Sequence, residues 1–145
     1  MLEHDTLRKT LYSEAIAAVT ALAFPCRIGD EAFVPPTDGS LYGEFWFRTG
    51  KSKQMELGPA TGYECTSGIL QFTLYAAEKN GDGAILRLGG QLKHRFNRKQ
   101  FQVAPDGYVT LETVAVETLP PRKGGDKVVI VDAAFDFYHR NPNAT

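Results

Sequence analysis

The histidines and two aspartates of this sequence are the residue types that could form a metal site or an acid–base pair. His4, His94 and His139 are scattered along the chain, and none is spaced from a cysteine or carboxylate as metal ligands usually are. Asp132 and Asp136 would share one face of a strand about 13 Å apart, which is wider than the carboxylate pairs of glycosidases. We therefore expect no metal, and we assign the two aspartates to a solvated sheet face or a subunit contact.

Two glycine-containing segments could bind a phosphate or hold a nucleophile. Residues 80–83 (Asn-Gly-Asp-Gly) precede a predicted helix, but they lack the Lys-Ser/Thr of a P-loop, and Asp82 would repel a phosphate. Residues 65–68 (Cys-Thr-Ser-Gly) are predicted to lie in a strand, and the sequence identifies no base for them. We therefore expect a protein that is not an enzyme and uses no cofactor.

Basic residues are concentrated between positions 87 and 99, where no acidic residue occurs. They are Arg87, Lys93, Arg95, Arg98 and Lys99. On a helical wheel Arg87, His94 and Arg98 fall on one face, opposite the apolar stripe. This face is either solvated or contacts an acidic partner or a phosphate backbone, and Lys51 and Lys53 could make similar contacts.

The composition is that of one folded domain. The chain has 145 residues, 43% of them hydrophobic, and its 16 Lys and Arg nearly balance 17 Asp and Glu, so no global field attracts nucleic acid. Cys26 and Cys65 are too few for a disulfide scaffold and are expected to be buried thiols. The apolar run at 15–24 is too short for a membrane span and lacks the flanks of an export signal. We expect no membrane association.

The elements that must position these residues begin with an amphipathic helix over 6–23. Asp5 or Thr6 is expected to cap its start, because both side chains can accept backbone hydrogen bonds. Tyr12 and Ile16 fall beside the apolar stripe, next to Val19, and make the apolar face unusually wide. We expect these three residues to form a subunit interface, and the alternative is that they pack under a loop.

The rest of the sequence reads as strands around a second helix. Alternating apolar residues predict strands over 41–49, 63–77, 101–104, 108–118 and 127–139. A helix is predicted over 83–97, with Gly89 and Gly90 where two elements approach closely. Residues 50–62 are expected to form an exposed loop or the tip of a long hairpin, and aromatic residues on both faces of 41–49 suggest that both faces are covered.

This order of elements predicts a single α+β domain over residues 1–145. Hairpin-length connections between the strands favour an antiparallel or mixed sheet, with about four to six strands packed against two helices.

Three segments resemble the tail terminator proteins of long-tailed (siphovirus-type) bacteriophages, small proteins that cap the tail tube. The pattern F-x-P-P-x-D-G-x-x-Y occupies residues 33–42, after the N-terminal amphipathic helix. The pattern G-I-L-Q at 68–71 is followed by G-x-G at 81–83 and a helix. The resemblance spans roughly residues 7–138, and its motifs are structural rather than catalytic.

The resemblance implies a structural virion protein that forms a hexameric ring and ends tube polymerisation. Its implied partners are other copies of itself, the tail tube protein on one ring face and the head–neck connector on the other. DNA would cross the lumen without sequence-specific binding, and the protein would be assembled in the host cytoplasm. The family offers no catalytic residues. Our own interpretation assigns the tube, neck or lumen contacts to Lys51, Lys53, Arg87, His94 and Arg98.

Other classes of function fit the same sequence. Another phage head–tail joining or tail-completion protein would also oligomerise, but it would bind head-side partners first. A small nucleic-acid-binding or ligand-binding α+β module would use the basic residues of 87–99, with Phe96 and Phe101 nearby. A nucleic-acid-binding module would bind as a monomer, and its binding would weaken with salt. A ligand-binding module would need a concave pocket with converging polar groups.

Overall fold

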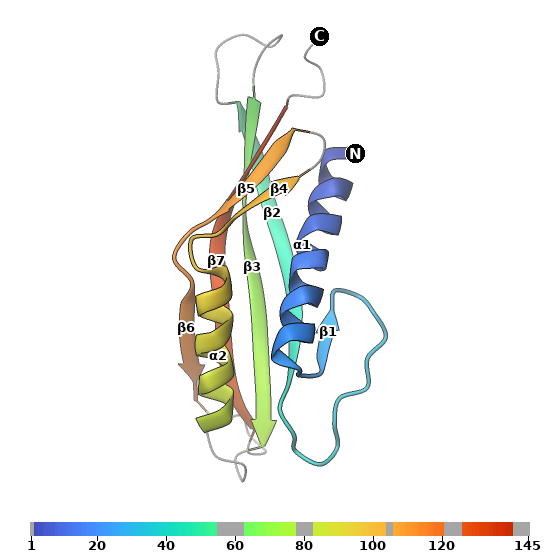
Figure 1. Cartoon of the computed structure of the whole chain (residues 1–145), viewed down its shortest axis with the longest axis vertical. Coiled ribbons are helices and arrows are strands. Elements are labelled where there is room, and N and C mark those ends of the chain that lie inside the picture. The colour runs from blue at the N-terminus through green and yellow to red at the C-terminus, as the bar shows by residue number, and fades with distance from the viewer. Residues whose placement is uncertain (1, 55–62, 78–82, 104–105, 121–125, 141–145) are drawn as a thin grey trace.

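The computed structural model describes residues 2–54, 63–77, 83–103, 106–120 and 126–140 (Figure 1). In this part of the chain two helices lie over one face of a mixed β-sheet. The helices are α1 (Leu2–Leu22) and α2 (Gly83–Phe96). The strands are β1 (Cys26–Ile28), β2 (Tyr42–Gln54), β3 (Tyr63–Ala77), β4 (Gln100–Val103), β5 (Gly107–Leu111), β6 (Ala115–Leu119) and β7 (Asp126–Arg140). The expected single-domain α+β fold is confirmed.

The sheet is built around three long strands. Its order is β1-β2-β3-β7-β5-β4. Strand β6 pairs with the same edge of β7 as β5 does, further along that strand. β3 and β7 are antiparallel over their full lengths, from Tyr63↔Arg140 to Ala77↔Asp126. β1 alone among the described strands runs parallel to its neighbour, β2. Because side chains alternate along each strand, every second residue of β2, β3 and β7 points toward the helices.

Both helices cover that same face. α1 buries four side chains on it: Leu7, Leu11, Ala15 and Ala18. α2 buries Ile85, Leu88, Gly89, Leu92 and Phe96. Between them the rings of Phe45, Phe72 and Phe96 form a continuous series, with centroid separations of 4.8 Å and 5.6 Å. The core is therefore one apolar layer between the helices and the sheet.

The first helix starts earlier than the sequence pattern suggested. It begins at Leu2, so Asp5 lies in its first turn instead of capping it. The Asp5 carboxylate pairs with Arg8 at 2.8 Å and Lys9 at 3.2 Å. The neighbouring Arg8 and Lys9 lower the pKa of Asp5. The ionised carboxylate stabilises the helix, because it lies near the positive end of the helix dipole.

The predicted strand over 108–118 is two strands, β5 and β6. Between Leu111↔Phe135 and Ala115↔Asp132 the chain advances four residues while β7 advances three, which is a β-bulge. The end of α2 docks at this point, because the Asn97 side chain accepts a hydrogen bond from the Val114 N–H at 2.8 Å. An alternation pattern cannot show where one extra residue is accommodated.

Two further boundaries differ from the expectation. Strand β1 was not predicted, since three residues are too short to show alternation, and it raises the described strands to seven. Residues 51–54 belong to β2 and pair with β3 up to Gln54↔Glu64, so β2 extends beyond the predicted strand 41–49 and, of the two alternatives for 50–62, these residues fit the long hairpin. Residues 55–62 of the expected loop lie outside the described residues.

Gly68 occupies a place where a side chain does not fit. The β2–β3 register shifts between Thr49 and Ser52, next to the pair Thr49↔Gly68. A Cβ at Gly68 would lie 2.5 Å from Cζ of Phe135 and still closer to the carbonyl oxygen of Arg48. The close approach of the backbone of β2 and a core aromatic ring therefore requires glycine.

We expect Gly68→Ala to lower the free energy of unfolding by about 1–3 kcal/mol, because β2 or the Phe135 ring must move. Urea denaturation measures this change. Gly90→Ala is the matched control, since a Cβ there would meet no described atom within 4 Å. In a helix this control should gain about 0.5–1 kcal/mol, and equal losses from both substitutions would contradict the packing argument.

Candidate functional site

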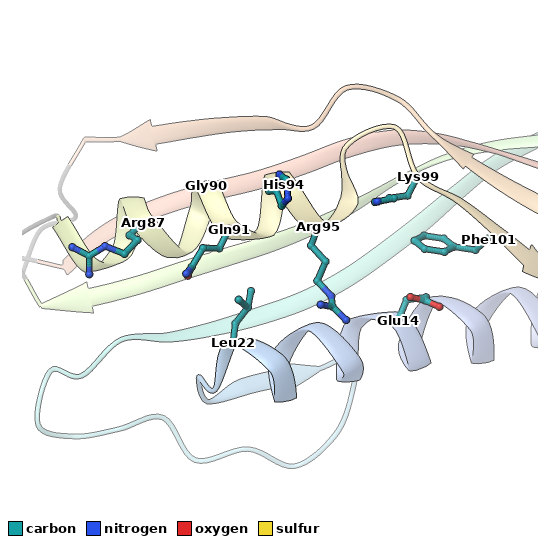
Figure 2. A pocket seen from close by; sticks show the side chains of 9 residues that line it. All are labelled: Glu14, Leu22, Arg87, Gly90, Gln91, His94, Arg95, Lys99 and Phe101. Carbon is teal, nitrogen blue, oxygen red and sulfur yellow. The ribbon is translucent and has the colours of Figure 1, made fainter.

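The basic residues of α2 line a groove between α1 and α2, with a volume of about 710 Å³ (Figure 2). α2 contributes Arg87, Gly90, Gln91, His94 and Arg95. Lys99, just before β4, and Phe101, within β4, follow, and α1 contributes Glu14 and Leu22. Figure 2 shows Arg95 reaching from α2 across the groove toward α1. Two parts of the chain that are distant in sequence, 14–22 and 87–101, therefore converge on one basic cleft.

The helical period explains why these residues face the groove. The opposite side of α2 packs on the sheet at Gly89. A Cβ atom added to Gly89 would lie 3.1 Å from Cγ1 of Val116, so the absence of a side chain lets the helix approach the sheet closely. Residues 87, 91, 94 and 95 then line the groove, and Gln91 and Arg95 point toward α1 (Figure 2). The predicted close approach is confirmed for Gly89. Gly90 instead opens the groove, because no side chain fills it there.

The groove combines positive charge with apolar lining residues. Arg87, Arg95 and Lys99 supply cations, and none of them forms an ion pair with another described residue. Glu14 is the one acid among the described residues that line it, and Leu22 is an apolar neighbour. Such a surface suits an extended acidic segment that carries an apolar side chain, because charge steers it and burial holds it.

Arg98 does not share this face, contrary to the helical-wheel prediction. α2 ends at Phe96, and Arg98 adopts a left-handed backbone conformation with φ +56°. Its N–H donates to the carbonyl oxygen of Glu112 at 3.3 Å. Arg98 therefore lies beside the bulge between β5 and β6, in a separate shallow depression. The side chains of Lys51 and Lys53 lie outside the described residues.

The three residues expected at a subunit interface divide into two groups. Tyr12 packs on the core, with its ring edge-on to Phe45 at 6.2 Å and to Phe47 at 5.7 Å. Val19 is half-buried and also packs against the core. Ile16 is 47% exposed, so it is the member of the three that is available for an outside contact.

The sheet face opposite the helices is a feature that the sequence interpretation missed. No described helix covers this face, although both faces were expected to be covered. It carries the partly buried side chains of Trp46, Ile69 and Ile130. Stacked tyrosine pairs flank them: Tyr42–Tyr75 and Tyr108–Tyr138, each at 4.9 Å. The aromatic alternation in 41–49 was the available signal, and one side of it marks a face of mixed polarity that no described helix covers.

This face also carries the two aspartates that the sequence placed on one face of a strand. Asp132 and Asp136 both lie on it, and Asp136 accepts a hydrogen bond from Ser67 Oγ at 2.7 Å. On the other face His139 is buried, with Nε2 3.0 Å from Thr66 Oγ1. Among the described residues no group of three or more His, Cys, Asp or Glu side chains could hold a metal. Neither described helix is long and apolar enough to cross a membrane.

Comparison with known proteins defines the fold. No protein-family model matches the chain, and no curated protein matches it. One solved structure, known only by a sequence identifier, is similar to it with a TM-score of 0.65 and 16% sequence identity. The similarity covers 94% of this chain and 96% of that one. At so low an identity, this similarity establishes the fold alone.

Both cysteines are held as thiols. Burial raises the pKa of Cys26 to about 12, and the charge of Glu44 adds to the effect. Burial also raises the pKa of Cys65, together with the charge of Asp136. The two thiolates that could attack an electrophile are therefore suppressed at neutral pH.

We expect Cys26 to react with a thiol reagent at pH 8 at least about tenfold more slowly than free cysteine, since only roughly one part in 10⁴ is thiolate. A time course in the Cys65→Ala variant isolates Cys26. Above a pH of about 12 the thiolate dominates, and unfolding in guanidinium should restore ordinary reactivity at pH 8. Fast labelling of the folded variant would contradict this assignment.

Proposed function

We propose that this chain is a structural virion protein of a long-tailed phage, a tail terminator. It forms a ring, in our proposal a hexamer, that caps the tail tube, ends tube growth and contacts the head–neck connector. DNA crosses the lumen without sequence-specific binding, and the ring is assembled in the host cytoplasm. The motifs at 33–42, 68–71 and 81–83 support this proposal from the sequence.

The uncovered sheet face is the observation that carries the proposal. Antiparallel sheets with one open face usually place polar side chains on it. Here Trp46, Ile69 and Ile130 lie in its middle. Apolar side chains on an open sheet face are suited to protein–protein contact, and here Gln71, Thr73 and Asp132 lie between them and can supply polar contacts. We assign this face to the tube protein or the connector.

A second observation supports assembly over catalysis. Ile16 is 47% exposed on α1, and the basic groove lies beside the same helix. The molecule therefore offers recognition surfaces on its helix layer and on the open face of its sheet. A subunit within a stack of rings needs such surfaces, because it contacts neighbours within its ring and partners above and below it.

Tryptophan fluorescence tests the assigned face, since Trp46 is the one tryptophan of the sequence. When tubes of the encoding phage's tail tube protein are added, the Trp46 emission should shift to shorter wavelength and acrylamide quenching should fall. Electron microscopy of the same mixture should show capped tube ends. The physical reason is that the contact removes the indole ring from water.

A Trp46→Phe, Lys93→Trp variant provides the control, because it moves the tryptophan to an exposed site on the helix side. Its emission should respond much less. Capped tubes with unchanged Trp46 emission would remove this face from the contact. Uncapped tubes, together with salt-sensitive nucleic-acid binding by the monomer, would contradict the proposed function.

We expect Ile16→Asp to fold normally, with a loss of stability within about 0.5 kcal/mol, because the side chain is largely exposed. The same substitution should lower tube capping about tenfold or more, as a charge is then placed in an apolar contact. Thermal unfolding and counts of capped ends measure the two effects. Leu86→Asp, at a site 40% exposed on α2, is the matched control, and equal effects would exclude Ile16 from the interface.

A further inference from the structure

The segment that connects β1 and β2, residues 29–41, lies on the far side of α1 from the basic groove (Figures 1 and 2). We name it the connecting loop. It presents Asp30 and Glu31, both exposed, and neither forms an ion pair with another described residue. Its Val34 is 86% exposed, more than any other large hydrophobic side chain described.

The connecting loop is held in place at both ends. At its start the Gly29 N–H donates to the carbonyl oxygen of Phe45 at 2.9 Å. Further along, the ring of Phe33 packs on Tyr42 at 6.0 Å. At its end the Ala77 N–H donates to the carbonyl oxygen of Gly39 at 3.1 Å. Two consecutive prolines stiffen it, so a contact made by Val34 costs little ordering entropy.

The groove is complementary to the connecting loop in charge and in apolar character. Its cations Arg87, Arg95 and Lys99 match the two exposed acids, and its apolar residues Leu22 and Phe101 match a valine. The net charge of the chain is only −1, so attraction between copies must come from such local patches.

We propose that the connecting loop of one copy occupies the groove of the next copy. Within one chain α1 stands between the loop and the groove, so the contact joins two different surfaces on two molecules. A contact of this head-to-tail type repeats from copy to copy and closes into a ring where the rotation allows it. The inference rests on the proposed function, and it assigns Arg87 and His94 to the neighbouring subunit instead of the tube, neck or lumen.

A charge exchange tests the contact in the free protein. Light scattering over a range of concentrations should show self-association of the wild-type chain without tubes. Glu31→Arg and Arg95→Glu should each weaken it about tenfold or more. The protein that carries both substitutions should recover to within about threefold of the wild type, because the pair is restored with reversed charges.

The matched controls carry the same charge changes elsewhere. Lys93→Glu lies on α2 outside the groove, and Glu117→Arg lies on β6. Neither should change self-association by more than about threefold. A wild-type chain that stays monomeric at every concentration would overturn the inference, as would a double variant no better than the weaker single variant.

Cross-linking identifies the partner surface. Copies with Val34→Cys and copies with Gln91→Cys, mixed and treated with a short bis-maleimide, should form a mixed dimer. Copies with Ile69→Cys on the uncovered sheet face replace Gln91→Cys in the control and should give none. The native thiols contribute little because their pKa values are raised. A cross-link from Val34→Cys to Ile69→Cys alone would overturn the inference.

The inference and the proposed function fail in different ways. A monomeric chain that still caps tubes in electron micrographs overturns the loop–groove contact and leaves the proposed function standing. A chain that forms rings through this contact but ignores tube ends does the reverse. If Arg95→Glu abolishes capping without changing self-association, the groove belongs to the tube protein, and the inference is wrong.

Discussion

The antiparallel pairing of β3 with β7 is the constraint on which the rest of the structure depends. It fixes fifteen residues of each strand against one another, from Tyr63↔Arg140 to Ala77↔Asp126. Strands β2, β5 and β6 pair directly with one of these two strands, and the edge strands β1 and β4 are each attached through one neighbour. Since neighbouring residues on a strand point to opposite faces, one register defines both the helix-covered core and the uncovered face.

The same pairing sets the position of the basic groove. α2 rests on β7, β3 and β6, and Asn97 joins its end to the bulge at Val114. A side-chain amide that accepts from a strand N–H replaces the ladder bond that a bulge interrupts. The position of α2 over the sheet therefore depends on the break between two strands, which holds its end, as well as on Gly89, which lets the helix approach the sheet.

Sequence patterns predicted the elements whose signal is local. The stripe of α1 and the alternation in β3 and β7 are set by burial on one face, so their periods appear directly in the residue order. β1 was missed because three residues show no period, and its partner in β2 is far along the chain. Arg98 was misplaced because a wheel assumes that the helix continues, whereas it ends two residues earlier.

The candidate site was less predictable than the fold for a related reason. The cations of α2 were visible as a cluster, but Glu14, Leu22 and Phe101 join them only through tertiary packing. The second face of the sheet was expected to be covered, and no described helix covers it. Aromatic residues on both sides of 41–49 are compatible with a buried strand and with a contact surface, and only the placement of both helices on one side distinguishes the two.

The position of β7 in the chain has a consequence for biosynthesis. This strand is central in space, yet it spans Asp126–Arg140, after every other described element in the chain. The hairpin of β2 and β3 can pair as soon as it leaves the ribosome, but the core, the groove and the uncovered face all need β7. Non-local pairing of this kind completes late in folding. A nascent chain is thus unable to complete its core, its groove or its uncovered face before residue 140 has been synthesised.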